Sequence, residues 1–196
     1  MRNLRKLLHE DYIEDRDCQV GTPAYRALRH RDGRRRSQVL EVLKSRKSFD
    51  AVDLYAAAWI LNHGDTHEEA AKAHELAMRA AELGHREAKW LAAAALDRSL
   101  MYLGQPQKYG TNIVPDGVGY RLWDVDPNTT DRERSNWDVP ALAEMQRRAS
   151  EQAAPQPPME TAPVWLRNAI ERWKASEDCA LSRAELGSSA SHCGGF

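Results

Sequence analysis

Cysteine is scarce in this sequence, and the few cysteines present are irregularly spaced. The chain of 196 residues contains only Cys18, Cys179 and Cys193. An odd number of cysteines at wide intervals fits neither a disulfide framework nor a zinc-binding knuckle. We therefore expect a protein of a reducing compartment, the cytoplasm, that is held together without disulfides.

The sequence also lacks an excess of charge and a long apolar run. Its 28 basic and 29 acidic residues give a formal net charge of -1, so no overall field attracts the protein to nucleic acid or to an anionic membrane. The start, MRNLRKLLHEDYIEDRD, contains no apolar run of signal-peptide length, and no later segment is apolar enough to span a bilayer. We expect no membrane partner.

One local run of charge stands out against this balance. Residues 26–36 read RALRHRDGRRR, and apolar residues at helical spacing resume soon afterwards. A nucleic-acid site would need interleaved aromatic side chains or a matching basic face elsewhere, and the sequence contains neither. The run is therefore predicted to be a solvated turn and helix start, and nucleic acid is not an expected partner.

Recognisable catalytic and cofactor motifs are absent as well. The sequence contains no glycine-rich phosphate loop, no nucleophile elbow and no Cys–His pair. His67 and His74 share a helix face, but no carboxylate or cysteine joins them at metal-ligand spacing. The sequence predicts neither a metal site nor a cofactor.

What the sequence does contain is a series of helices. With 42% hydrophobic residues, the chain suits one domain with appendages. Three consecutive helical segments end at Gly64, Gly84 and Gly104, where glycine supplies the left-handed conformation of a tight C-terminal turn. Thr66 and Glu69 have the spacing of a capping box. Because short connections make neighbouring helices antiparallel, the predicted fold is mainly α, an antiparallel helical bundle with one small β-hairpin.

The remaining segments complete the predicted organisation of the chain. A Pro-Asp-Gly turn between runs rich in Val, Ile, Tyr and Trp predicts the hairpin. The last helix has an apolar face too large to leave in water, so we expect it to dock on the protein's own helices, with a partner chain as the alternative. The predicted parts are a helical domain at 1–151 with a polar loop at 104–112 and a hairpin at 113–126, a proline-rich linker at 152–163, an amphipathic helix at 164–178 and a disordered tail at 187–196.

The third of the consecutive helices carries two charged residues in apolar surroundings. Asp97 and Arg98 lie in a segment that is hydrophobic on nearly every side, and Asp97 shares a stripe with Trp90 and Met101. A buried charge persists only when it is paired or strongly hydrogen-bonded. At least one of these two charges is therefore expected to be buried against a partner, in a role that is either structural or functional.

The loop that follows, GQPQKYGTN, is dense in groups that form hydrogen bonds. Its side chains offer amides, a phenol and a hydroxyl, and its second glycine permits a close approach of the backbone. The residues predicted to bind a ligand are Gln107, Tyr109, Gly110, Thr111 and Asn112. The alternative is that the loop only ties itself to Asp97 and Arg98.

Two family resemblances accompany these motifs. The stretch AMRAAELGHREAKWLA resembles a Sel1-like repeat of the tetratricopeptide superfamily, over about one and a half repeats. The stretches AAAWILNHGD, LAAAALDRSLMYLGQPQKYGTN and WDVDPNTTDRERSNWDVPALAE together resemble an uncharacterised bacterial family, Domain of Unknown Function 6624. This resemblance marks as site residues His63, Asp97, Arg98, Pro106, Gln107, Tyr109, Gly110 and Thr111, and by a looser match Asp15 and Arg16. Asn112 stands where the family has glutamine, and the resemblance implies no activity.

The sequence supports three hypotheses about function. The first is a cytosolic binding protein that takes a small polar ligand or a peptide in a pocket built from the loop, Asp97, Arg98 and His63. The second is a hydrolase-like enzyme that uses acid–base chemistry at the same pocket, and its catalytic candidates are His63, Asp97, Arg98 and Tyr109. The third is a structural interaction module for a protein partner. A closed pocket in which His63 and Asp97 converge would favour the enzyme.

Overall fold

The structure is a computed structural model that describes residues 3–14, 18 and 21–189, and this part of the chain is mainly α-helical. The helices are α1 (Leu4–Tyr12), α2 (Pro23–Ser45), α3 (Ala51–Asn62), α4 (His67–Glu82), α5 (Ala88–Tyr102), α6 (Asp131–Asn136), α7 (Leu142–Ser150) and α8 (Val164–Ser189), with a short 3-10 helix at Met159–Thr161. The strands β1 (Ile113–Pro115) and β2 (Tyr120–Leu122) form one antiparallel hairpin. The predicted mainly α fold with one small hairpin is confirmed. No helix among the described residues is both long and apolar enough to cross a membrane.

Local capping explains where the central helices begin and end. The Thr66 hydroxyl accepts a hydrogen bond from the Glu69 N–H at the start of α4, which is one half of the predicted capping box. Gly84 and Gly104 have positive φ angles of 87° and 72°, as a left-handed C-terminal turn requires. Gly64 differs from the prediction, because its φ is not positive. A Cβ atom there would lie 2.8 Å from the Leu61 carbonyl oxygen, so close packing explains this glycine.

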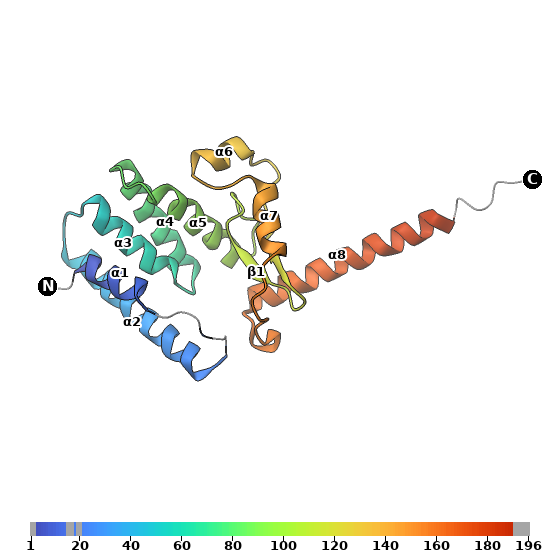
Figure 1. Cartoon of the computed structure of the whole chain (residues 1–196), viewed down its shortest axis with the longest axis horizontal. Coiled ribbons are helices and arrows are strands. Elements are labelled where there is room, and N and C mark those ends of the chain that lie inside the picture. Colours follow the sequence, from blue (N-terminus) through green and yellow to red (C-terminus); the bar gives the residue numbers. More distant parts are fainter. Residues whose placement is uncertain (1–2, 15–17, 19–20, 190–196) are drawn as a thin grey trace, which may run out of the picture.

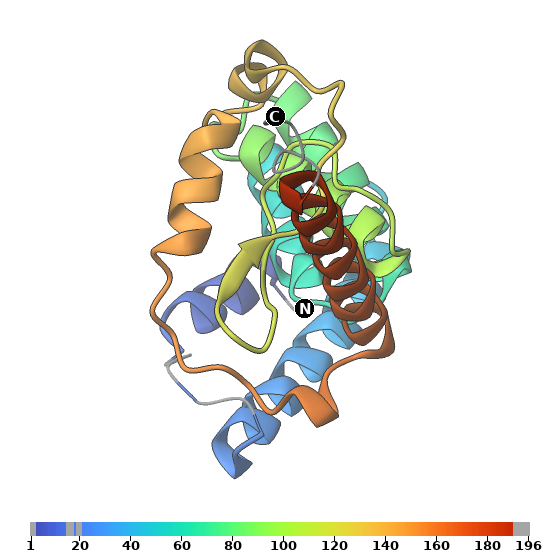
Figure 2. The same cartoon turned by 90° about the vertical axis from the view of Figure 1, so that its right-hand side faces the viewer.

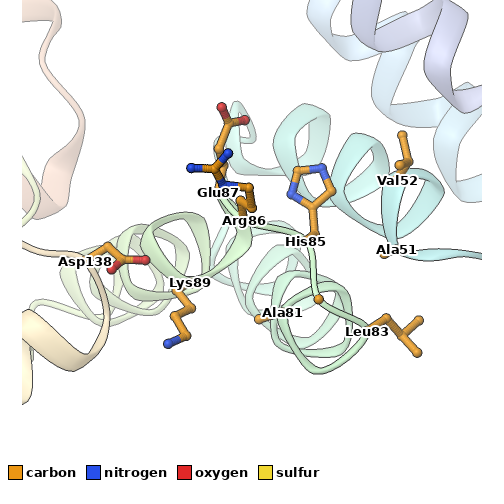
Figure 3. A pocket seen from close by; sticks show the side chains of 10 residues that line it. Ala51, Val52, Ala81, Leu83, His85, Arg86, Glu87, Lys89 and Asp138 are labelled. Atoms are coloured by element: carbon orange, nitrogen blue, oxygen red, sulfur yellow. The ribbon is translucent and has the colours of Figure 1, made fainter.

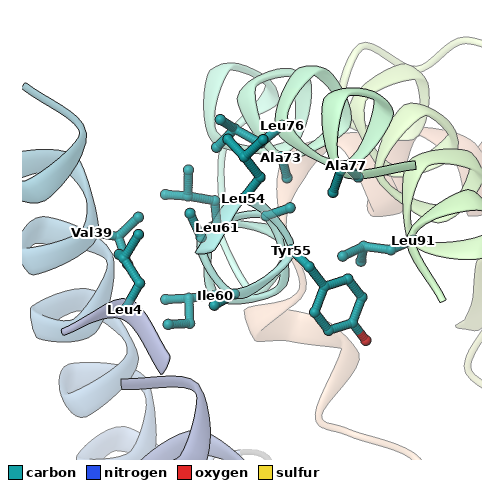
Figure 4. Packing of buried hydrophobic residues seen from close by; sticks show 14 of the residues in the cluster. Leu4, Val39, Leu54, Tyr55, Ile60, Leu61, Ala73, Leu76, Ala77 and Leu91 are labelled. Carbon is teal, nitrogen blue, oxygen red and sulfur yellow. The ribbon is translucent and has the colours of Figure 1, made fainter. Parts of the chain in front are cut away.

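The main core surrounds α3, which packs against α1, α2, α4 and α5 (Figure 4). Leu54 and Leu61 of α3 are buried among Val39 of α2, Leu76 of α4 and Leu91 of α5. Buried alanines on α3, α4 and α5 let the backbones of these helices approach closely. Because α3 is covered on almost every side, it is the central helix of the domain.

A second apolar cluster joins the hairpin to the C-terminal helix. The hairpin lies between α7 and α8 (Figures 1 and 2). Trp123, which follows β2, is fully buried and contacts Trp165 and Trp173 of α8 at ring-centroid distances of 5.7 and 5.4 Å. The Trp173 indole N–H also donates to Asp124 at 2.7 Å. The structure therefore places the first half of α8 on the protein's own domain, as we expected.

The segments on either side of this docking site differ in part from the sequence prediction. Within the predicted linker, Gln156 is held by the hairpin, because its amide accepts from Gly117 N–H at 3.1 Å and donates to the Gly119 carbonyl at 2.8 Å. The helix α8 continues to Ser189, past the predicted end at 178, and its distal half projects away from the domain (Figure 1). Positions 187–189 of the predicted tail are thus helical, and the rest of that tail lies outside the described residues.

Candidate functional site

Asp97 lies on α5 and holds the polar loop in place. Its carboxylate is fully buried and accepts four hydrogen bonds of 2.8 to 2.9 Å, which come from the loop. The donors are the backbone N–H groups of Lys108, Tyr109 and Thr111 and the Thr111 hydroxyl. Burial raises the pKa of Asp97, and these donors act in the opposite direction. The buried, partnered charge expected from the sequence is therefore Asp97, and its partners are three backbone N–H groups and one hydroxyl.

The amide of Gln107 is also used inside the fold. Gln107 is fully buried, and its Nε2 donates to the carbonyls of Asn112 and Trp123 at 3.2 and 2.9 Å. Its Oε1 accepts from Asn112 N–H at 2.9 Å. Its backbone pairs with the chain around Val125 in an isolated parallel bridge. These contacts occupy the amide N–H and oxygen of Gln107, which the sequence predicted to bind a ligand.

The other loop residues are packed in a similar way. Tyr109 is buried beside Ala93 and Val139, and its carbonyl accepts from Arg134 Nε at 2.9 Å. Gly110 has a φ of 85°, and a Cβ atom there would lie 3.4 Å from Val125 Cγ2. Arg134, a fully buried arginine of α6 that braces the loop, was not predicted from the sequence. Its only sequence signal is its position as the second arginine of the helix-start motif TTDRERS.

His63 and Arg98 have partners different from those of Asp97. His63 Nε2 lies 3.4 Å from Asp11 Oδ2, and the same carboxylate oxygen accepts from the Trp59 indole N–H at 3.0 Å. Arg98 donates to the Asn62 carbonyl at the end of α3. The structure thus brings His63 together with Asp11 of α1, a residue that the sequence analysis did not single out. Asp15 and Arg16, which the family resemblance added, lie outside the described residues.

The basic run on α2 corrects one prediction, because it is not a solvated turn. It lies within α2, and Arg35 and Arg36 are buried. The Arg35 guanidinium is 3.3 Å from Asp11 and 2.6 Å from Asp32, and it also pairs with Glu14. These three carboxylates each offer an oxygen within 4.8 Å of the others, a spacing that suits a metal ion. The positive charge of Arg35 is already bound among them, so the cluster is an ion-pair network.

A hollow lined by aromatic side chains, which we call the aromatic cup, was not predicted from the sequence. It is a hollow of about 450 Å³ between α1, α3, the start of α5 and the segment after α6. Its lining consists of Tyr12, Tyr55, Trp59 and Trp90 together with Arg86, Glu87 and Asp138. The Tyr12 and Trp59 rings meet edge to face at 5.2 Å and 69°, and the hydroxyls of Tyr12 and Tyr55 are 3.2 Å apart.

A larger hollow adjoins the aromatic cup. It has a volume of about 1140 Å³ and is lined by the C-terminal end of α4, the start of α3, the turn between α4 and α5, Lys89 at the start of α5, and Asp138. The two hollows share Arg86, Glu87 and Asp138, so they adjoin each other at these residues. Figure 3 shows Asp138 reaching this region from a different segment than the turn that carries Arg86 and Glu87. We call the two hollows together the groove.

The sequence held only a weak signal for the aromatic cup. Tyr55 and Trp59 are four residues apart and therefore lie on one face of α3. Trp90 was expected in a buried stripe of α5, but it is 39% exposed and lines the cup, while Ala88 and Leu91 of the same turn are fully buried in the main core. Tyr12 and Asp138 come from distant segments, so their approach depends on the tertiary fold.

His85 lines the larger hollow, and its titration is expected to make the stability of the protein depend on pH. Its ring stacks on Tyr55 at 4.0 Å, and burial lowers the pKa of His85, while Glu87 acts in the opposite direction. Because the folded-state pKa lies below the ordinary value of 6.5, the unfolded chain binds this proton more readily. The neutral imidazole contributes stability that is complete above that ordinary value and is lost as the pH falls through the lower, folded-state pKa.

The variant His85→Phe keeps a stacking ring and removes the titration. We expect the free energy of unfolding of the unmodified protein to fall more than that of the variant between about pH 7.5 and 5.5. Urea denaturation of both proteins at several pH values measures this difference. Equal pH dependence in the two proteins would contradict the burial of the imidazole.

Comparisons with known proteins leave the family assignment open. No protein-family model matches this chain, and no curated protein or solved structure gives a significant match to it. The resemblances to Sel1-like repeats and to the family of unknown function therefore stay predictions from the sequence.

Proposed function

We propose that this protein binds a peptide segment in the groove. The observation that supports the proposal is that the two hollows adjoin each other and share Arg86, Glu87 and Asp138 as lining residues. Small-molecule pockets typically enclose roughly 300 to 1000 Å³, and the larger hollow alone has a volume of about 1140 Å³. An elongated ligand suits such a groove better than a compact one, so of the two ligand classes expected from the sequence we favour the peptide.

The proposed location differs from the polar loop. The loop residues expected to contact a ligand are engaged with Asp97, Arg134 and the segment around Trp123. None of them lines either hollow of the groove. The loop therefore serves the proposed function indirectly, by fixing the chain that leads to Asp138.

The lining of the groove suits a peptide that carries both polar and apolar groups. Leu83 is 59% exposed at the edge of the larger hollow and offers an apolar contact. Arg86 and Lys89 are exposed cations, and Glu87 and Asp138 are exposed anions. Mixed charges around apolar residues are the usual composition at the rim of a protein interface, where they determine orientation and specificity.

The chain offers a matched pair of variants for testing this proposal. Leu83 and Leu103 are the C-cap residues of α4 and α5, and each precedes a glycine of positive φ. Both leucines are exposed, at 59% and 51%, but Leu103 lines neither hollow. Substitution of either by aspartate should therefore leave the fold intact and differ only in its effect on the groove.

The experiment measures the binding of a fluorescent random-peptide pool by anisotropy. We expect saturable binding that Leu83→Asp weakens by about tenfold and that Leu103→Asp leaves unchanged. Absence of saturable binding, or an equal loss in the two variants, would contradict the proposal. Cleavage of the bound peptides that disappears in His63→Gln would instead support the acid–base enzyme.

A further inference from the structure

The aromatic rings of the cup lie around one small volume. Tyr12 of α1 and Trp59 of α3 meet at 69°, so they form a corner rather than a flat wall. Tyr55 adjoins Trp59 at 6.1 Å, and Trp90 contributes from the start of α5. Tyr12 is 51% exposed and Trp90 39% exposed. A single exposed aromatic residue is ordinary, whereas several around one hollow are typical of a binding site.

Negative charge lies beside these rings. Glu87 and Asp138 both line the cup. Burial, the Tyr12 hydroxyl and the Glu87 carboxylate together raise the pKa of Tyr55 well above its ordinary value, so Glu87 acts directly on the aromatic surface. Among the described residues, the Asp138 carboxylate has no hydrogen-bond or ion-pair partner. Asp138 is also the one described residue other than glycine with a positive φ, of 56°, an uncommon conformation that functional sites often hold.

The one cation of the cup does not occupy the rings. Arg86 lines the hollow and is exposed. The arginine and lysine side chains that lie over aromatic rings in the described part of the chain belong to Arg46, Lys108, Arg121 and Arg172. Arg86 is not among them, so no arginine or lysine of the described residues lies over the rings of Tyr12, Trp59 or Trp90, while one face of Tyr55 is covered by His85.

The rings attract a cation but provide few acceptors for its hydrogen bonds, so the acceptors of the cup are the exposed carboxylates of Glu87, which already interacts with Tyr55, and Asp138. The hydroxyls of Tyr12 and Tyr55 are directed at each other at 3.2 Å, and the Trp59 N–H is used by Asp11. An unmodified ammonium group brings three N–H donors that need partners when they leave water. A trimethylammonium group keeps the positive charge and has no N–H donors, and it is the cation that aromatic cages recognise best.

We propose that the aromatic cup binds a trimethylated lysine side chain of the peptide that lies in the groove. This inference rests on the proposed function and specifies its ligand. The methylated ammonium contacts Tyr12, Trp59 and Trp90, with Glu87 and Asp138 balancing its charge. The rest of the peptide continues past Arg86 into the larger hollow.

The test uses three capped pentapeptides, Gly-Gly-X-Gly-Gly, and the full-length protein. In the first, X is trimethyllysine. In the second, X is lysine, and in the third it is the neutral isostere in which carbon replaces the ammonium nitrogen. Titrations followed by tryptophan fluorescence should show that the protein binds the trimethyllysine peptide about tenfold more tightly than either of the others.

Two variants separate a cation–π contact from simple apolar burial. Trp90→Leu keeps an apolar side chain and removes the π face, so it should weaken binding of the trimethyllysine peptide about tenfold and change binding of the isostere little. Trp90→Phe should recover part of the loss. Tyr25→Leu removes a half-buried aromatic ring of α2 outside the cup and is the matched control, expected to have no effect.

The outcomes distinguish this inference from the function on which it rests. Equal binding of the trimethyllysine peptide and its isostere would overturn the inference and show an apolar cup without selectivity for charge. Failure of all three pentapeptides to bind, while the random pool binds and responds to Leu83→Asp, would overturn the inference and leave the peptide-binding function standing. If the random-peptide pool also failed to bind, both the inference and the peptide-binding function would be overturned.

Discussion

Replacing Asp97 by alanine is expected to destabilise the protein by about 3 kcal/mol. The substitution removes a fully buried carboxylate that accepts four hydrogen bonds. Its donors are three backbone N–H groups and one hydroxyl of the loop, and they would remain buried without an acceptor. Chemical denaturation measures the effect as a change in the free energy of unfolding.

Two further variants serve as controls for this prediction. Thr111→Val removes only the hydroxyl donor, so its expected cost is about 1 kcal/mol. Asp116 also accepts backbone N–H bonds, from Val118 and Gly119 at 2.9 and 2.8 Å, but in a turn that is open to solvent. Asp116→Ala is therefore expected to cost about 1 kcal/mol or less. A cost for Asp97→Ala no larger than that for Asp116→Ala would show that burial does not amplify the loss.

The sequence contained good local signals for the helices and for the buried charge. The glycines that end α4 and α5 and the threonine that caps α4 could be predicted from the sequence. Capping depends on a few adjacent residues, which the sequence shows directly. The position of Asp97 on an apolar helix was enough to predict that it is buried with a partner. These features share one property, which is that the residues that cause them lie within two or three helical turns of each other.

The role of the polar loop and the place of the groove needed the tertiary structure. A loop rich in amides and hydroxyls has the same sequence whether its groups face a ligand or a neighbouring helix. Only the direction of the Asp97 carboxylate, toward the backbone of 108–111, decides between the two. The groove gave no periodic signal beyond the spacing of Tyr55 and Trp59, because Tyr12, Trp59 and Asp138 come from three segments that pack together only in the folded chain.

Truncation before Pro155 is the second change with a large expected effect, because it removes the docked half of α8. Leu166 and Trp173 are 4% and 6% exposed in the intact protein. Burial of two such side chains contributes roughly 4 kcal/mol, which corresponds to a decrease in Tm of about 10 °C for a chain of this size. The truncated protein should also bind a hydrophobic dye, because fully buried Trp123 loses its cover. Thermal unfolding and dye fluorescence measure the two effects.

The matched control is truncation after Cys179, which removes only the part of α8 that projects away from the domain (Figure 1). That protein keeps the contacts of Trp173 with Trp123 and Asp124 and the pairing of Arg121 with Glu177. Because its apolar contacts with the hairpin are intact, its Tm should change by less than about 2 °C. If instead the protein truncated before Pro155 were as stable and as monomeric as the full chain, the docked position of α8 would contribute nothing to folding. The apolar face of α8 would then be available for a partner chain, and the second cluster around Trp123 would have to be stable without it.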